Sequence, residues 1–138
     1  MKTQRVETWA APIEDKPGAL AAKFAALSAA GANLEFIIAR RAPDRPGSGV
    51  VFVTPINGAK QAKAARAAGF QKTANLHTIR VEGADKPGLG ACMTQGLADA
   101  GLNLRGLSAA AIGKKFVCHI AVDTAADAAK VVRLLRKM

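Results

Sequence analysis

An internal repeat constrains the fold of this chain more than any other feature. At an offset of 70 residues, DKPGALAAKFAALSAAGANL at 15–34 aligns with DKPGLGACMTQGLADAGLNL at 85–104, and ten of the twenty positions are identical. So dense a match at one offset indicates two copies of one supersecondary unit. We therefore expect two domains, residues 1–73 and residues 74–138.

Hydrophobic periodicity and turn residues predict the same order of elements in both copies. A strand, at 5–11 or 76–82, ends just before each DKPG turn. Pro17 and Pro87 suit the first position of the helix that follows, and Gly31 and Gly101 are typical of its end. The remaining predicted elements are strands at 34–39, 50–54, 104–110 and 116–122, a helix at 58–68 capped by Asn57, and a helix from Thr124 to the C-terminus.

The two copies differ at their last strand. Residues 70–73 provide a short fourth strand in the first copy, whereas the second copy stops after its second helix. The pattern predicts an α+β fold with two tandem ferredoxin-like βαββαβ units, four helices on antiparallel sheets, and a second unit that lacks its last strand. Because the edge left open there has unpaired backbone groups, another segment must fill it.

Composition indicates a folded protein and argues against nucleic-acid binding. Of the 138 residues, 50% are hydrophobic and 22% are charged, which is enough apolar material for a packed core. The net charge of +10 divides equally between residues 1–70 and 71–138, and aromatic residues make up only 4%. Nucleic-acid binding usually needs a basic stripe or stacking aromatics. We therefore retain a nucleic-acid binder only as the weakest alternative.

Motifs for transport, metal binding and catalysis are absent from the sequence. No signal peptide or apolar run of membrane-spanning length occurs, so we expect a soluble cytoplasmic protein. Cys92 and Cys118 are expected to be reduced thiols, and with His77 and His119 they form no metal-binding spacing. Without a P-loop, GxGxxG or nucleophile elbow, we expect no cofactor, no catalytic residue and no enzymatic activity.

The DKPG turns carry the chemistry of a candidate ligand site. Unpaired amides at a helix start favour a carboxylate, glycine permits close approach of a ligand, and the aspartate can accept an ammonium group. An asparagine after each helix offers both a donor and an acceptor. This combination suits a zwitterion such as an amino acid. The candidate ligand-binding residues are Asp15, Lys16, Pro17, Gly18, Ala19, Asn33 and Leu34 in the first copy, and Asp85, Lys86, Pro87, Gly88, Leu89, Asn103 and Leu104 in the second.

A purely structural interpretation of these residues stays open. Turn and cap chemistry alone favours Asp, Asn, Pro and Gly at such positions, and a shared fold would preserve them in both copies. Arg40, Arg41 and Arg45 are interpreted as solvated residues of a hairpin, with an anion-facing cluster as the alternative.

The residues also carry a resemblance to a known family. A strand, DKPG at a helix start and G-x-N-L after that helix, found twice in register, resemble a tandem pair of ACT domains covering nearly the whole chain. The resemblance implies a small effector, chiefly an amino acid, and a role in regulating an enzyme of amino-acid metabolism. The ACT domains that bind serine have a histidine where this chain has Ile13 and Gly83.

We therefore expect a non-catalytic regulatory protein that binds an amino acid at the DKPG turns, between units or between the chains of a homodimer, and signals to a partner protein. The alternative is a regulatory subunit or adaptor that contacts proteins without a ligand.

Overall fold

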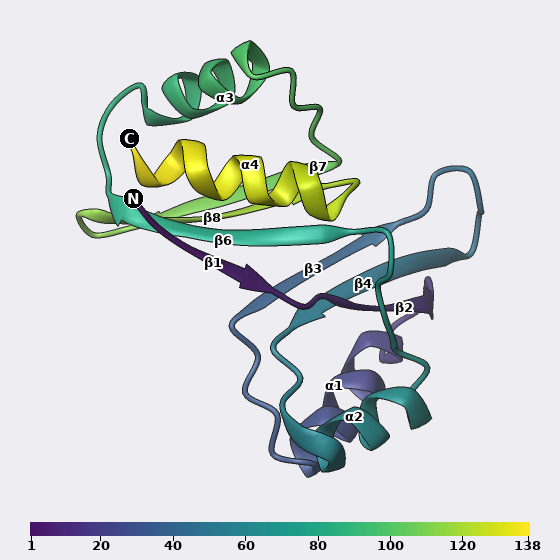
Figure 1. Cartoon of the computed structure of the whole chain (residues 1–138). Coiled ribbons are helices and arrows are strands. Elements are labelled where there is room, and N and C mark those ends of the chain that lie inside the picture. Colours follow the sequence, from purple (N-terminus) through teal and green to yellow (C-terminus); the bar gives the residue numbers. More distant parts are fainter. The chain divides into compact units, whose positions relative to one another are not determined.

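The structure, a computed structural model describing residues 1–138, divides the chain into two compact units (Figure 1). The first unit is residues 7–73, and the second unit is residues 74–138 together with residues 1–6. Each unit has a four-stranded antiparallel sheet and two helices. The predicted α+β class with four helices on antiparallel sheets is confirmed. None of the helices combines the length and apolar character needed to cross a membrane.

The first unit follows the predicted order. Its elements are β2 (Trp9–Glu14), α1 (Ala19–Ala29), β3 (Phe36–Arg41), β4 (Ser48–Thr54), α2 (Gly58–Ala67) and β5 (Gln71–Lys72). The strands are ordered β3-β4-β2-β5 across the sheet, and Figure 1 shows both helices on one face of it. Alternate strand residues, such as Trp9 on β2 and Val53 on β4, are buried beneath these helices with Leu27 of α1 and Ala65 of α2.

The second unit repeats this arrangement with a strand borrowed from the N-terminus. Its elements are β1 (Lys2–Val6), β6 (His77–Ala84), α3 (Leu89–Asp99), β7 (Gly106–Ile112), β8 (Lys115–Val122) and α4 (Ala125–Arg136). The sheet order is β1-β6-β8-β7, so β1 holds the place beside β6 that β5 holds beside β2 in the first unit. The opening predicted in the second sheet is filled by β1, which pairs antiparallel with β6 from Lys2 opposite Glu82 to Val6 opposite Thr78.

The N-terminal segment therefore differs from the sequence-based expectation. The expected first domain, residues 1–73, includes residues 1–6, whereas in the structure they belong to the second unit. The single strand expected at 5–11 is two strands, β1 and β2, which lie in different sheets. The physical reason is that backbone hydrogen bonding at an open sheet edge accepts many sequences, so side-chain pattern does not reveal which edge a short strand completes.

The helix starts are also corrected by the structure. Pro17 and Pro87 were expected at the first helical position, but α1 and α3 begin two residues later. The intervening Gly18 and Gly88 have φ of +85° and +80°, which is the left-handed region that favours glycine and excludes a continuous helix. By contrast, Thr124 caps α4 as predicted, with its hydroxyl accepting a hydrogen bond from the amide of Asp127 at 3.0 Å.

Candidate functional site

Each DKPG turn borders a hollow, and the two hollows are unequal. The first hollow, in the first unit, has a volume of about 180 Å³. The second hollow, in the second unit, has a volume of about 480 Å³. Both are formed where the start of a helix meets the adjacent strands of its own sheet. The first hollow is lined by Ile13, Glu14, Asp15, Lys16, Leu20, Ala39, Arg40, Arg41 and Gly49.

The second hollow has a mainly apolar lining. Its residues are Asp85, Lys86, Gly88, Leu89, Gly90, Met93, Thr94, Leu107, Ala109, Ala110, Ala111, Phe116 and Cys118. At the offset of 70 residues, the positions of Arg40 and Arg41 become Ala110 and Ala111. The second hollow therefore has two small alanines where the first has two arginines. It has more room, and it lacks the positive charge that Arg40 and Arg41 give to the first hollow.

Backbone amides at the start of α3 have no acceptor within the chain. The amide of Leu89 donates to the carbonyl of Lys86 at 3.2 Å, and that of Cys92 donates to the carbonyl of Gly88 at 3.0 Å. Between them, the amides of Gly90 and Ala91 make no hydrogen bond, and no side chain caps the helix. Such amides, together with the positive end of the helix dipole, favour an anion. A β-carbon on Gly88 would meet no atom within 4 Å, so the turn is open.

Charges within the chain already compensate the aspartate of the first turn. The Arg41 Nε lies 3.0 Å from the Asp15 Oδ2. Beside this pair, the Lys16 Nζ lies 2.7 Å from the Glu14 Oε2, and this hydrogen bond lowers the pKa of the Glu14 carboxyl below its usual value. An ammonium group entering the first hollow would compete with Arg41 for the Asp15 carboxylate.

The aspartate of the second turn has no such partner. Its backbone is fixed, because the Asp85 amide donates to the carbonyl of Lys114 at 2.9 Å, but the carboxylate makes no ion pair. Among the lining residues, burial raises the pKa of the Cys118 thiol to about 11. Cys118 is therefore a neutral, apolar wall group at neutral pH, and Asp85 supplies the negative charge.

The predicted site residues are only partly brought together. Asp15 and Lys16 line the first hollow, and Asp85, Lys86, Gly88 and Leu89 line the second. Asn33 and Asn103 are exposed and follow the far ends of α1 and α3, about 16 Å away for an 11-residue helix. They line neither hollow, so no unit places its own aspartate and asparagine on one small ligand.

The other predicted site residues lie in the cores or at the turns and not in the hollows. Leu34 and Leu104 pack against the cores of their units, and Pro17, Ala19 and Pro87 lie at the turns without lining a hollow.

Residues of the hollows that the sequence did not single out include Leu107 and Phe116. Arg41 was expected to be a solvated hairpin residue; its side chain is exposed but also pairs with Asp15. The signal that could have found this asymmetry is the change from Arg40-Arg41 to Ala110-Ala111 between copies. No group of three His, Cys, Asp or Glu side chains is placed to share a metal ion.

Solved structures of similar shape identify the fold. The chain is similar to the protein BT0572 from Bacteroides thetaiotaomicron, with a TM-score of 0.79 and 15% identity over 98% of this chain and 89% of that one. It is also similar to the regulatory subunit of aspartate kinase from Thermus thermophilus in its ligand-free form, with a TM-score of 0.67 and 18% identity over 99% and 94% of the two chains. The chain has a tandem ACT fold.

The corresponding aspartate kinase subunit from Thermus flavus gives a similar match to this tandem ACT fold, with a TM-score of 0.66 and 19% identity over 99% and 94% of the chains. No protein-family model matches the sequence, and no curated protein matches it. The likeness therefore rests on the arrangement of strands and helices, which the duplicated DKPG and G-x-N-L motifs predict.

Proposed function

We propose that this protein is a non-catalytic regulatory protein that binds an amino acid in the second hollow. The observation that carries the proposal is that the hollow is lined by both Gly90, whose helix amide has no hydrogen bond, and Asp85, whose carboxylate has no ion pair; the amide of Ala91, the next residue of the helix, is also unbonded. An α-carboxylate needs donors, and an α-ammonium needs an acceptor beside them. The turn before α3 and the first residues of that helix supply both groups, five positions apart in the chain.

The walls of the second hollow favour an amino acid with an apolar side chain. Leu89, Met93, Leu107 and Phe116 offer hydrocarbon and aromatic surface, and Cys118 is neutral. A charged ligand side chain placed against these four residues would lose its hydration, which is unfavourable. The volume of about 480 Å³ lies within the range of small-molecule sites.

Regulation of an enzyme is the role that we propose for this binding. The tandem ACT fold is shared with regulatory subunits of aspartate kinase, which supports an enzyme partner. A ligand can alter that partner only by binding more tightly to one conformation or assembly than to another. We propose that two copies of the chain form a homodimer and that the bound amino acid shifts the association of this dimer with the enzyme.

Thermal unfolding in the presence of each standard amino acid tests the proposal. We expect an apolar amino acid to stabilise the protein, by about 2.7 kcal/mol at a hundred times its dissociation constant. Asp85→Asn should abolish this shift. Asp15→Asn is the matched control and should retain it, because the Asp15 carboxylate is paired with Arg41. If no amino acid at millimolar concentration moves the transition, an adaptor role without a ligand becomes the better explanation.

A further inference from the structure

The second unit contains another hollow, which the proposed amino-acid site does not use. Its volume is about 680 Å³, and we call it the basic hollow. It lies along β1, β6 and the β7–β8 hairpin, and it is lined by Lys2, Arg80, Glu82, Gly83, Ala84, Ile112, Lys114, Lys115, Phe116 and Val117. Four of these side chains are cationic and one is anionic.

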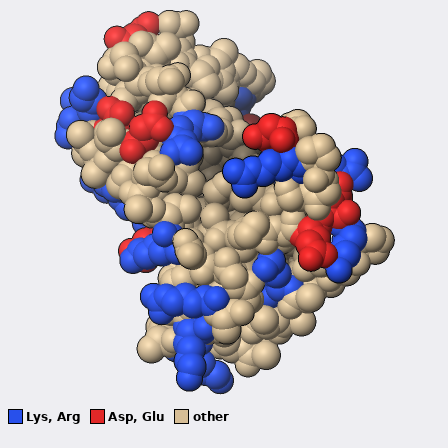
Figure 2. All heavy atoms as spheres, turned by 90° about the vertical axis from the view of Figure 1, so that its right-hand side faces the viewer, with Lys and Arg blue, Asp and Glu red and all other residues tan.

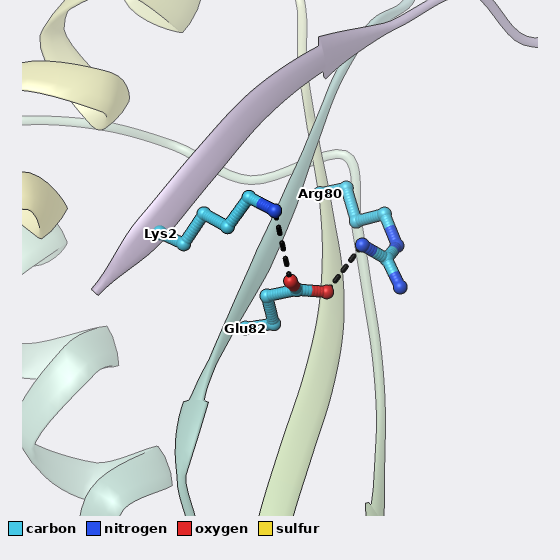
Figure 3. Close-up of polar contacts among 3 residues, drawn as sticks. All are labelled: Lys2, Arg80 and Glu82. Atoms are coloured by element: carbon cyan, nitrogen blue, oxygen red, sulfur yellow. Dashed lines mark hydrogen bonds and ion pairs between the residues drawn. The ribbon is translucent and has the colours of Figure 1, made fainter.

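The single carboxylate of the basic hollow is already engaged. Figure 3 shows Lys2 from β1 and Arg80 from β6 approaching the two oxygens of Glu82. The Lys2 Nζ lies 3.5 Å from the Glu82 Oε1, and Arg80 donates to Oε2. Burial by itself would raise the pKa of the Glu82 carboxyl, but Arg80 and Lys2 outweigh this effect and lower it. Glu82 is therefore ionised and paired with two cations.

The remaining donors of the basic hollow are unused. Lys114 and Lys115 make no ion pair, and the Nε of Arg80 is buried without a hydrogen-bond partner. Because surrounding atoms shield this Nε from solvent, a bound anion would contact the exposed part of the Arg80 side chain together with the two lysines. With Glu82 counted, the lining has a surplus of three positive charges, which favours a multiply charged anion over a single carboxylate.

Apolar surface adjoins these donors. Ile112 is 76% exposed, an unusual degree for a large hydrophobic side chain, and Phe116 and Val117 line the same hollow. We infer that the basic hollow binds a nucleotide, whose phosphates contact Lys114, Lys115 and Arg80 while its base lies against Ile112 and Val117. This site goes beyond the proposed amino-acid binding and does not depend on it.

The charge pattern favours a small nucleotide over a nucleic-acid strand. On the face that Figure 2 displays, Lys and Arg are spread among uncharged residues and are interrupted by Asp and Glu. A strand would need a continuous basic track. The basic hollow instead concentrates its charge within a volume typical of small-molecule sites.

Calorimetric titration with ATP in the absence of divalent metal tests the inference, with pyrophosphate and adenosine as partial ligands. We expect saturable binding of ATP, weaker binding of pyrophosphate and none of adenosine at the same concentration. Lys114→Ala combined with Lys115→Ala should weaken ATP binding by about tenfold or more, because two charged contacts are lost. The matched control, Lys60→Ala with Lys63→Ala on α2, removes the same charge outside the hollow and should change the affinity by less than about twofold.

Amide NMR spectra locate the ligand in the same experiment. ATP should shift the resonances of Gly83 and Val117, which line the basic hollow, and leave those of Gly18 at the first DKPG turn unchanged. The inference is overturned if ATP does not saturate at millimolar concentration, or if both double variants weaken binding equally. It is likewise overturned if single-stranded RNA binds and ATP does not, because the basic residues would then bind a nucleic-acid strand along the protein surface and not a nucleotide in the basic hollow.

Discussion

The ring of Phe116 lies over Gly83 in the second sheet, where its Cε1 would be 3.1 Å from a β-carbon placed on that glycine. The two residues are cross-strand partners. In the first sheet the corresponding pair is reversed, because Ile13 faces Gly49 and its Cγ1 would be 3.2 Å from a β-carbon there. Each pair combines one large residue with one glycine. In the second unit the large side chain, that of Phe116, stands on the central strand β8 and lines both of that unit's hollows.

Substitution of Gly49 tests whether the close packing of Ile13 against this position requires glycine. A β-carbon there would also lie 2.6 Å from the carbonyl oxygen of Arg40, and since that atom belongs to the backbone the strand itself must move. Gly49→Ala should lower the free energy of unfolding by about 1 to 3 kcal/mol in urea denaturation. Gly106→Ala is the control, because a β-carbon there meets nothing within 4 Å. Equal stability of the two variants would contradict the fit.

A lysine connects the two helices of the first unit. The Lys23 Nζ on α1 donates to the carbonyl of Ala68 at 2.5 Å, at the end of α2, and lies 5.8 Å from the centre of the Phe70 ring. Lys23→Ala should lower the free energy of unfolding by about 1 to 3 kcal/mol, because a charged hydrogen bond and a cation–π contact are lost together.

The control for Lys23 is Lys63→Ala, an exposed lysine of α2. We expect it to change the free energy of unfolding by less than about 0.5 kcal/mol. Chemical denaturation measures the free energy of unfolding of both variants. If Lys23→Ala lowers it no more than the control does, the contacts of Lys23 do not contribute to stability.

The repeat predicted the architecture well because its evidence is local. The DKPG turn, the helix after it and the glycine that ends it depend on residues within a span of twenty, and the structure has this helix in both copies, with its start two residues later than expected. The missing strand of the second unit was also visible. The sequence did not reveal that residues 2–6 fill this place. β1 is joined to β6 by backbone hydrogen bonds between segments more than 70 residues apart, and such pairing leaves no local signal.

The site was predicted less completely for a related reason. Asp15 and Asn33 were grouped by motif, but α1 separates them within the unit. The pairing of Asp15 with Arg41 depends on β3 lying beside the turn, which only the folded sheet reveals. The inequality of the two hollows follows from that tertiary contact.

The cluster of Glu82 with Lys2 and Arg80 predicts a pH dependence of stability. The pKa of the folded carboxyl lies below the usual 4.5, so the ionised form stabilises the fold above the pKa of the unfolded chain, and this contribution is lost as the pH falls through the folded pKa. Glu82→Gln should therefore lower the melting temperature at pH 7, and the difference from the wild type should disappear in acid.

Glu35→Gln serves as the control for Glu82, because the Glu35 carboxylate has no ion pair. Melting temperatures measured between pH 7 and pH 3 compare the two variants with the wild type. A Glu82→Gln difference that is constant over this range would mean that the loss arises from packing and not from the charge.

The two cysteines should differ sharply in reactivity. Cys92 is exposed on α3, whereas Cys118 is 2% exposed on β8 and burial raises its pKa to about 11. Because the thiolate is the reactive form, a thiol reagent at pH 8 should modify one cysteine per native chain and both after unfolding. Cys92→Ser should leave the native protein unreactive, and Cys118→Ser should leave the native count at one. Rapid modification of Cys118 in the native Cys92→Ser variant would mean that this wall of the second hollow opens to solvent, and it would contradict the proposal that the wall is a buried apolar surface for an amino-acid side chain.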